Sequence, residues 1–206
     1  MKRYFVTGIG TDVGKTIASA ISVEAMGADY WKPIQAGDLH QTDTMKVQSL
    51  VSNKQSVFYP ETYRLTKPMS PHAAAFYDKV EINPDDVLLP KHGRNLIIEG
   101  AGGLMVPLSK DFLMIDLIEK LGAEVILISQ NYLGSINHTL LSAEALKNRN
   151  ITVKGIIFNG QSVNTTETFI CEYTGLKVLL RIDNEKIIDK KTILKYASKP
   201  SMKMLF

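Results

Sequence analysis

Short apolar runs alternate along the chain with segments in which apolar residues recur at helical spacing. The apolar runs are rich in Ile, Val and Leu on both faces, a pattern typical of strands buried inside a sheet. Between apolar runs, helical segments are predicted at residues 111–122 and 135–149. Buried strands are predicted at residues 3–7, 95–100, 124–129, 153–159 and 177–182.

This alternation predicts an α/β fold in which a mostly parallel central sheet carries helices on both faces. Ligands of such folds bind at the carboxyl ends of the strands, so functional residues are expected in the loops that follow strands. Residues 37–94 are less regular and hold three prolines between Tyr59 and Phe76, which predicts loops and a helix or two. Neither a repeat nor a low-complexity linker interrupts the chain, and a single domain of residues 1–206 is expected.

The composition is that of an ordinary globular protein, with 45% hydrophobic and 22% charged residues. No stretch approaches the roughly 18 apolar residues of a membrane span, and the N-terminus enters a strand without the pattern of a signal peptide. Cys171 is the single cysteine, so neither an internal disulfide nor a cysteine zinc site can form. These features predict a cytoplasmic protein without a membrane partner.

The net charge of +3 is unevenly placed, because residues 181–206 hold seven Lys or Arg against three Asp or Glu. Most of these basic residues lie on an amphipathic helix predicted over residues 190–199, in which Tyr196 is the single aromatic residue. A solvated helix face explains this pattern better than a nucleic-acid site does, and no nucleic-acid partner is expected.

The stretch VTGIGTDVGKTIAS, residues 6–19, joins the first predicted strand to a helix that starts near Gly14. Backbone amides of a glycine-rich turn and the positive end of a helix dipole bind phosphate oxygens, and Lys15 adds a neutralising charge. The common phosphate-loop pattern needs a glycine where this chain has Ile9, and Gly8 lies one residue further out. The turn nevertheless predicts a nucleotide phosphate site and a P-loop NTPase fold.

Four further polar residues are candidates for the same site, and three of them lie at or after the ends of predicted strands. Thr16 can place its hydroxyl on Mg²⁺, which also takes one or two carboxylates. Glu99 lies at the end of the strand NLIIEG, which is followed by AGG, and Asp43 follows the strand candidate DYWKP after a short loop. Lys32, within DYWKP, could stabilise a transferring phosphoryl group or a developing negative charge. Taken alone, each of these charged residues is more often a solvated surface residue.

Seven short motifs occur in a fixed order over about 150 residues: VTGIGTDVGKT at 6–16, KPIQAG at 32–37, TD at 42–43, SPHAAA at 70–75, EGAGGLMVPL at 99–108, LGSINHTLLS at 133–142 and GIIFNG at 155–160. In this order they resemble the dethiobiotin synthetase family of P-loop enzymes. The resemblance implies that ATP, carbon dioxide or bicarbonate, and 7,8-diaminononanoate are the substrates and that Mg²⁺ is the cofactor. One amine would become a carbamate, ATP would phosphorylate it to a carbamic-phosphoric anhydride, and the second amine would close the ureido ring.

The resemblance also implies roles for individual residues. Lys15 and Lys32 would be catalytic, and Thr16, Asp43 and Glu99 would hold the metal ion. The nucleotide would be bound by Thr11, Asp12, Val13, Gly14, Lys15, Thr16, Ile17, Asp43, Glu99, Gly100, Ala101, Gly102, Asn159 and Gly160. The diamine would be bound by Thr11, Lys32, Ala36, Ser70, Leu133, Gly134, Ser135, Ile136 and Asn137.

The helix that begins in LGSINHTLLS has a further implication, because the family uses this helix start from a neighbouring subunit to receive the substrate carboxylate. Ser135 is a good capping residue, and free amides at a helix start bind anions. A homodimer with shared sites is therefore implied. Asn137 and His138 could otherwise belong to a capped surface helix.

Several positions depart from the family pattern. Ala36 replaces a hydroxyl residue that relatives often carry, and Gly160 stands where they have an acidic residue after Asn159. The chain also lacks their proline-containing loop after the last strand, so a preference for ATP over GTP or CTP is not predicted. The alternative is a P-loop NTPase that is not a synthetase. A partition-type ATPase would carry a second lysine early in its phosphate loop, and a regulatory GTPase would need an Asn-Lys-x-Asp motif.

Overall fold

The central sheet has seven strands in the order β11-β10-β9-β1-β6-β2-β4, and every pairing within it is parallel. The computed structural model describes residues 1–203. The five predicted strands are confirmed, with ends that differ by one residue at most. The strands of the sheet are β1 (Arg3–Gly8), β2 (Asp29–Trp31), β4 (Phe58–Tyr59), β6 (Leu96–Glu99), β9 (Glu124–Gln130), β10 (Val153–Asn159) and β11 (Val178–Ile182).

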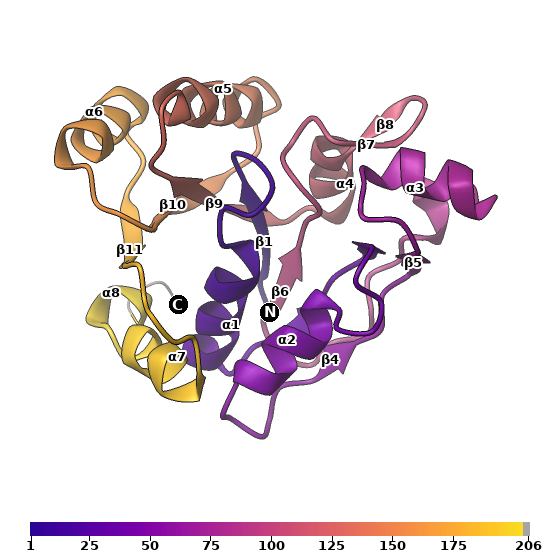
Figure 1. Cartoon of the computed structure of the whole chain (residues 1–206), viewed down its shortest axis with the longest axis horizontal. Helices are drawn as coiled ribbons and strands as arrows, with labels where there is room; N and C mark the ends of the chain where they lie inside the picture. The colour runs from indigo at the N-terminus through magenta and orange to yellow at the C-terminus, as the bar shows by residue number, and fades with distance from the viewer. Residues whose placement is uncertain (204–206) are drawn as a thin grey trace.

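Helices cover both faces of this sheet, as the alternation of elements predicts. On one face lie α1 (Lys15–Met26), α2 (Asp43–Leu50), α7 (Lys190–Ala197) and α8 (Pro200–Lys203). The other face carries α3 (Pro71–Asp78), α4 (Met114–Leu121), α5 (Ser135–Asn148) and α6 (Asn164–Thr174). Figure 1 shows α5 and α6 on the opposite side of β10 and β11 from α7 and α8.

The strands are apolar on both faces because each face has its own hydrophobic core. Successive side chains of a strand point to opposite sides. In β9, Val125 and Leu127 therefore pack in the core under α4, while Ile126 and Ile128 pack in the core under α1. All four side chains are completely buried. Because alternate side chains belong to the two cores, the last residue of each strand is held on one face of the sheet. This decides whether its side chain points toward the start of α1.

The β1 strand lies in the middle of the sheet, between β6 and β9. Val6 of β1 is opposite Glu99, the last residue of β6. On the other side of β6, Trp31 is opposite Ile98, so that Lys32 follows β2 at the level of Glu99. The loops after β1, β6 and β2 thus meet at one edge of the sheet, where parallel α/β folds bind their ligands.

The sequence pattern missed two small sheets. The irregular segment 37–94 holds α2, α3, a 3₁₀ helix at Pro84–Asp86, and the short strands β4 and β5 (Tyr63–Leu65). The β5 strand pairs in parallel with β3 (Ile34–Ala36). The predicted helix 111–122 starts later than expected, at Met114, because residues 112–113 form β8 (Phe112–Leu113), which pairs with β7 (Pro107–Ser109).

The start of α5 corrects the assignment of Ser135 as a helix cap. Gly134 is the N-cap, with φ near +100°, and Ser135 is the first helical residue. The side chain of Ser135 is buried and makes no capping hydrogen bond. A glycine adopts this left-handed conformation without the steric cost that a β-carbon adds. The backbone amides at the start of α5 are therefore left without a side-chain acceptor.

Candidate nucleotide and metal site

The glycine-rich loop between β1 and α1 is shaped for an anion. Gly14 is the N-cap of α1 with φ near +97°, and no side chain caps the helix. Asp12 also has a positive φ, of 58°. The free amides of the first helical turn thus carry the positive end of the helix dipole toward the loop. Lys15, only 8% exposed, donates from Nζ to the Gly10 carbonyl oxygen at 2.8 Å and so spans the loop.

Asn159, at the end of β10, holds this loop from the far side. Its Nδ2 donates to the carbonyl oxygen of Val13 at 3.1 Å, across 146 residues of sequence. A β-carbon on Gly14 would lie 2.3 Å from the same Nδ2. The loop therefore needs glycine at position 14 for its backbone conformation and for the space that Asn159 fills.

Glu99 is the carboxylate at the centre of the site. It ends β6, is 1% exposed, and uses its two oxygens differently. Thr16 donates from its hydroxyl to Oε1 at 2.9 Å, and the phenol of Tyr30 donates to Oε2 at 2.9 Å. Sequence reasoning named Glu99 and Thr16 but missed Tyr30, which reads as one more apolar core residue of β2.

Lys32 lies against both predicted metal-binding carboxylates. Its Nζ is 3.1 Å from Asp43 Oδ2 and 3.4 Å from Glu99 Oε1. It also donates to the carbonyl oxygen of Gly100 at 3.2 Å. Because Lys32 is only 3% exposed, these contacts replace the water that its ammonium group has lost.

Asp43 reaches Lys32 from the first turn of α2. Thr42 caps this helix, accepting a hydrogen bond from the amide of Met45 at 3.3 Å. The amide of Asp43 donates to Gln35 Oε1 at 3.1 Å, and Gln35 Nε2 donates to the Gly37 carbonyl oxygen at 3.0 Å. Gln35 is thus a buried link between the short β3 strand and α2 that sequence reasoning did not identify.

The charges of the site shift the pKa values of its lysines in opposite directions. Burial, together with the neighbouring ammonium group of Lys32, lowers the pKa of Lys15 to about 8. Burial alone would also lower the pKa of Lys32, but the carboxylates of Glu99 and Asp43 outweigh it and raise that pKa. Lys32 therefore stays protonated at neutral pH, while the pKa of Lys15, at about 8, lies closer to neutral pH.

The pKa values of the acidic partners shift in keeping with these contacts. Burial would raise the pKa of Asp43, but the ammonium groups of Lys32 and Lys46 and the hydroxyl of Thr16 lower it. Burial, with the Glu99 carboxylate, raises the pKa of Tyr30 well above its ordinary value. Tyr30 thus remains a hydrogen-bond donor, and Asp43 remains a carboxylate.

The donor set around Thr16 fits Mg²⁺. It consists of one hydroxyl and the carboxylates of Glu99 and Asp43, all oxygen donors. Mg²⁺ binds through one or two carboxylates and completes its shell with water and substrate phosphates. Within residues 1–203, no three His, Cys, Asp or Glu side chains gather as a metal cage of their own.

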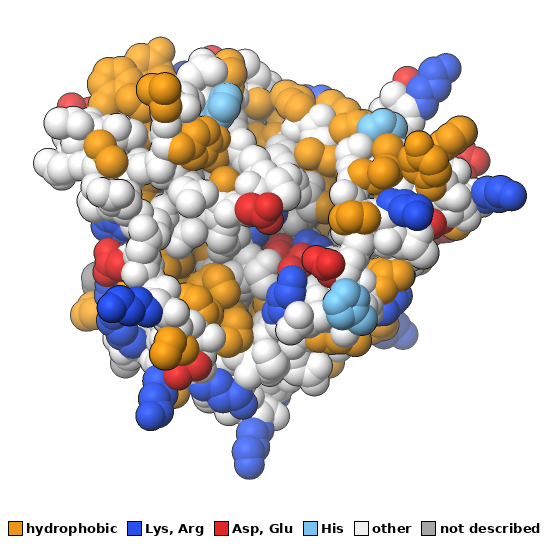
Figure 2. Space-filling model, viewed as in Figure 1, with side chains coloured by type: hydrophobic (Ala, Val, Ile, Leu, Met, Phe, Trp, Pro, Cys, Tyr) orange, Lys and Arg blue, Asp and Glu red, His pale blue; other side chains and the backbone are white. Residues whose placement is uncertain are grey.

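A groove of about 720 Å³ lies beside the phosphate loop. Thr11 and Gly10 line one side of it, and His138 and Leu141 of α5 line another. Thr11 and Asp12 are exposed, Val13 is buried, and Ile17, Gly100, Ala101 and Gly102 are half-buried or buried around the loop. Figure 2 shows acidic and basic side chains close together in a hollow near the start of α1.

The remaining predicted substrate residues are divided between two places. Ala36 ends β3, and Ser70 precedes α3 as its N-cap. The segment from Leu133 to Asn137 lies at the start of α5. No hydrogen bond among residues 1–203 connects this segment to Lys15, Lys32 or Glu99.

Gly160, a predicted nucleotide-binding residue, follows β10, where its amide donates to the Ile182 carbonyl oxygen at 2.9 Å.

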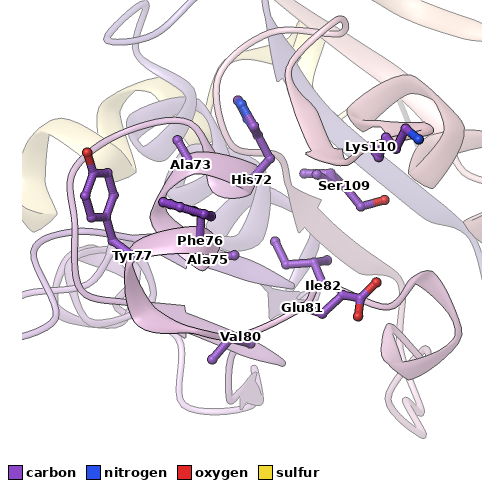
Figure 3. Close-up of a pocket in the computed structure, with 11 residues that line it drawn as sticks. His72, Ala73, Ala75, Phe76, Tyr77, Val80, Glu81, Ile82, Ser109 and Lys110 are labelled. Atoms are coloured by element: carbon purple, nitrogen blue, oxygen red, sulfur yellow. The ribbon is translucent and has the colours of Figure 1, made fainter.

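A second pocket, of about 600 Å³, lies between α3 and the β7–β8 hairpin (Figure 3). His72 of the SPH motif, Phe76 and Leu108 are among the residues that line it. None of the predicted nucleotide, metal or substrate residues lines this pocket. It is therefore separate from the cluster around Glu99.

Known proteins match the chain over nearly its whole length. The family described as "AAA domain" matches residues 2–192. An ATP-dependent dethiobiotin synthetase of Christiangramia forsetii is 54% identical over 198 residues, which cover 96% of this chain and 95% of that protein. The chain belongs to the ATP-dependent dethiobiotin synthetase family. A family member of Cytophaga hutchinsonii is 51% identical, with 97% of each chain covered.

Solved structures give the same fold at low sequence identity. The septum site-determining protein MinD of Pyrococcus horikoshii, complexed with Mg-ADP, aligns with a TM-score of 0.58 at 13% identity, over 99% of this chain and 92% of that one. A ParA family ATPase of Chlorobium tepidum aligns with a TM-score of 0.52 at 15% identity, and the alignment covers 100% of this chain and 97% of that one. The dethiobiotin synthetase family thus shares its fold with partition-type ATPases. At this identity the likeness concerns the fold alone.

Proposed function

We propose that this chain is the ATP-dependent ligase that closes the ureido ring of dethiobiotin, in biotin biosynthesis, from 7,8-diaminononanoate and carbon dioxide. One amine would first form a carbamate. ATP would phosphorylate the carbamate to a carbamic-phosphoric anhydride, and the second amine would then attack its carbonyl carbon. The ring C–N bond forms as the C–O bond to phosphate breaks, and phosphate leaves.

The observation that carries this proposal is the second buried lysine beside the phosphate loop. Lys32 Nζ lies 3.4 Å from Glu99 Oε1, and Thr16 of the phosphate loop donates to that same oxygen. A fixed ammonium group at this place can stabilise the carbamate and the charge of the phosphoryl group during transfer. Catalysis of phosphoryl transfer is mostly positioning and charge stabilisation, so the site needs no nucleophilic side chain.

The residues of the site divide the remaining work. Lys15 and the amides of residues 12–17 would cradle the triphosphate, with Asn159 and Gly160 near the base. Thr16, Asp43 and Glu99 would hold Mg²⁺, which supplies Lewis-acid stabilisation of phosphate charge when it is bound. Thr11, Ala36 and Ser70 would contact the diamine. The sequence match to enzymes named ATP-dependent supports ATP as the co-substrate.

The substrate carboxylate would be received by a second copy of the chain. At the start of α5, Ser135 is 1% exposed, and its hydroxyl has no hydrogen-bond partner among residues 1–203. The amides of that helix start also lack a side-chain cap. Leu133, next to them, is fully exposed. An anion-binding helix start beside an exposed apolar residue supports a homodimer with sites shared between subunits.

The partition-type alternative shares the fold but is not favoured. Residues 8–10 of the phosphate loop contain no lysine, whereas partition ATPases carry one early in this loop. The cytoplasm is the proposed compartment, because Cys171 is a free thiol in a chain with no second cysteine. No helix among the described residues is long and apolar enough to cross a membrane.

The decisive test is phosphate release by the purified protein with each component omitted in turn. Release should require 7,8-diaminononanoate, bicarbonate and Mg²⁺ together, and ATP, GTP and CTP compared at equal concentration give the base preference. Glu99→Gln should abolish release while the protein stays folded, and Glu124→Gln, at the opposite end of the sheet, serves as the matched control. Hydrolysis at the same rate without the diamine would contradict the synthetase function and favour a switch or partition ATPase.

A further inference from the structure

Tyr30 stands out as a polar group in the core whose role the proposed reaction does not explain. It lies in β2, it is completely buried, and it faces the core under α1. Its register partner on β6 is Ile97, so Tyr30 and Glu99 point to the same face of the sheet, two residues apart along β6. This register brings the phenol oxygen within 2.9 Å of Glu99 Oε2.

Among the described residues, the two carboxylate oxygens of Glu99 accept hydrogen bonds from different partners. Oε1 accepts from Thr16 at 2.9 Å and lies 3.4 Å from Lys32 Nζ. Oε2 accepts from Tyr30 alone. The carboxylate is 1% exposed, so water cannot readily replace the phenol if Oε2 turns away from it. Tyr30 therefore holds one of the two equivalent oxygens of Glu99 away from the phosphate loop.

We propose that Tyr30 is a positioning residue that makes Glu99 a one-oxygen ligand and thereby favours Mg²⁺ over Ca²⁺ at this site. The inference rests on the proposed function, in which Glu99 holds the metal ion of the nucleotide. With Oε2 engaged by the phenol, only Oε1 is turned toward Thr16 and the phosphate loop. The phenol thus opposes the rotation that would bring both oxygens to one cation.

The two cations differ in the way they use a carboxylate. Mg²⁺ demands a near-ideal octahedral shell with short bonds, whereas Ca²⁺ takes six to eight ligands and accepts both oxygens of one carboxylate. Each oxygen of Asp43 lies against a lysine, Oδ2 at 3.1 Å from Lys32 and Oδ1 at 3.6 Å from Lys46, whereas Oε2 of Glu99 meets only the neutral phenol of Tyr30 among the described residues. A group that holds this oxygen away from the cation therefore selects against Ca²⁺.

The inference is tested by metal binding to the protein with a non-hydrolysable ATP analogue. Mg²⁺ and Ca²⁺ are titrated against bound Mn²⁺, whose magnetic resonance signal reports displacement. Tyr30→Phe should lower the ratio of Mg²⁺ to Ca²⁺ affinity about 10-fold, the lower end of the change expected when an outer-shell partner of a metal ligand is removed. The affinity of each metal ion for the free nucleotide analogue is the same in every experiment. It therefore cancels when the affinity ratios of the variants are compared.

Tyr59→Phe is the matched control. Tyr59 lies on the adjacent strand β4, and its hydroxyl donates to the Lys91 carbonyl oxygen at 2.9 Å, away from Glu99. This variant should keep the wild-type ratio. An unchanged ratio in Tyr30→Phe, or an equal change in both variants, overturns the inference. A lower affinity for both cations with the ratio unchanged would assign Tyr30 a structural role only and overturns it as well.

A second measurement uses the wild-type protein and does not depend on how a variant folds. Infrared difference spectra on adding Mg²⁺ to protein labelled with ¹³C-glutamate report whether the bound carboxylate uses one oxygen or two. The band separation of a one-oxygen ligand is expected, and that of a two-oxygen ligand overturns the inference. Neither experiment contains the diamine, so a failed synthetase assay and a failed selectivity test are independent results.

Discussion

Lys32 and Asp43 form a nearly buried ion pair, with Nζ 3.1 Å from Oδ2, at the edge where the loops after β2 and β3 meet. The other oxygen of Asp43 lies 3.6 Å from Lys46, one turn further along α2, whose side chain is 37% exposed. The same carboxylate thus has one buried cationic partner and one solvated partner. This contrast allows the contribution of burial to be measured with a matched pair of variants.

Lys32→Met should destabilise the metal-free protein far more than Lys46→Met does. Removing one partner of a buried ion pair leaves an uncompensated charge and costs about 3 to 5 kcal/mol of unfolding free energy, whereas a surface partner contributes about 1 kcal/mol or less. Urea unfolding in the presence of a chelator measures both values. Equal losses in the two variants would contradict the burial argument.

The stability that Lys32→Met loses relative to wild type should also depend on pH. The native pKa of Asp43 is lowered, so the stability it contributes is fully present above its unfolded pKa, about 4, and is lost as the pH falls through the lower native pKa. The stability difference between wild type and Lys32→Met, measured by urea unfolding, should therefore begin to shrink below about pH 4 and vanish only below the lowered native pKa of Asp43.

Nucleotide binding should weaken in alkaline solution because of Lys15. Its pKa of about 8 in the free protein means that the ammonium group is lost as the pH rises through that value, and phosphate oxygens favour the protonated form. Metal-free binding of an ATP analogue, followed calorimetrically in buffers of different ionisation enthalpy, should take up almost no proton at pH 7 and approach one proton at about pH 9. Lys32 should add no proton in this range, because its pKa is raised. Binding that is constant from pH 7 to pH 9 would contradict this prediction.

Gly14→Ala should disrupt the phosphate loop, while Gly10→Ala should leave it folded. At Gly14 a β-carbon meets both a positive φ and Asn159 Nδ2 at 2.3 Å, whereas a β-carbon at Gly10 meets nothing within 4 Å. The left-handed conformation alone costs an alanine about 1 to 2 kcal/mol. Thermal unfolding and binding of the ATP analogue together measure the effect, and similar unfolding of the two variants would show that the loop tolerates a side chain at Gly14.

Leu133→Asp should convert the proposed dimer to a monomer. Leu133 is fully exposed beside the start of α5, and a charge there would have to be buried in a contact with a second copy. Leu88→Asp is the control, because Leu88 is 70% exposed in a different segment, after the 3₁₀ helix. Light scattering gives the molar mass of each variant. The monomer should bind nucleotide but not form the ring, and a Leu133→Asp dimer with full activity would contradict the shared site.

The central sheet was predictable from sequence because its strands are buried on both faces and read as continuous apolar runs. Two- and three-residue strands such as β3 and β8 give no such signal, and their pairing depends on distant partners. Ser135 was wrongly predicted as a cap because Gly134 adopts a positive φ and takes that place. Capping preferences predict which residue types can cap a helix, but the backbone conformation of the neighbouring residues decides which position is the cap.

The candidate site was predictable where charged residues follow strands, as Lys32 and Glu99 do. Tyr30 and Gln35 were not predicted, because their polar atoms matter only through contacts that the fold creates. Tyr30 looks like any aromatic residue of an apolar strand, and its meeting with Glu99 depends on the register of β2 against β6. Gln35 gains its role only because α2 begins opposite β3.

The position of β1 has a consequence for how the protein is made. Residues 3–8 are synthesised well before their partners on either side, which are residues 96–99 and 124–130. The middle of the sheet therefore cannot close until residues 124–130 have left the ribosome. Until then the apolar strand β1 lacks both of its neighbours, and such long-range pairing makes folding slow and exposes the chain to aggregation. The strand that anchors the phosphate loop thus depends on protection during synthesis.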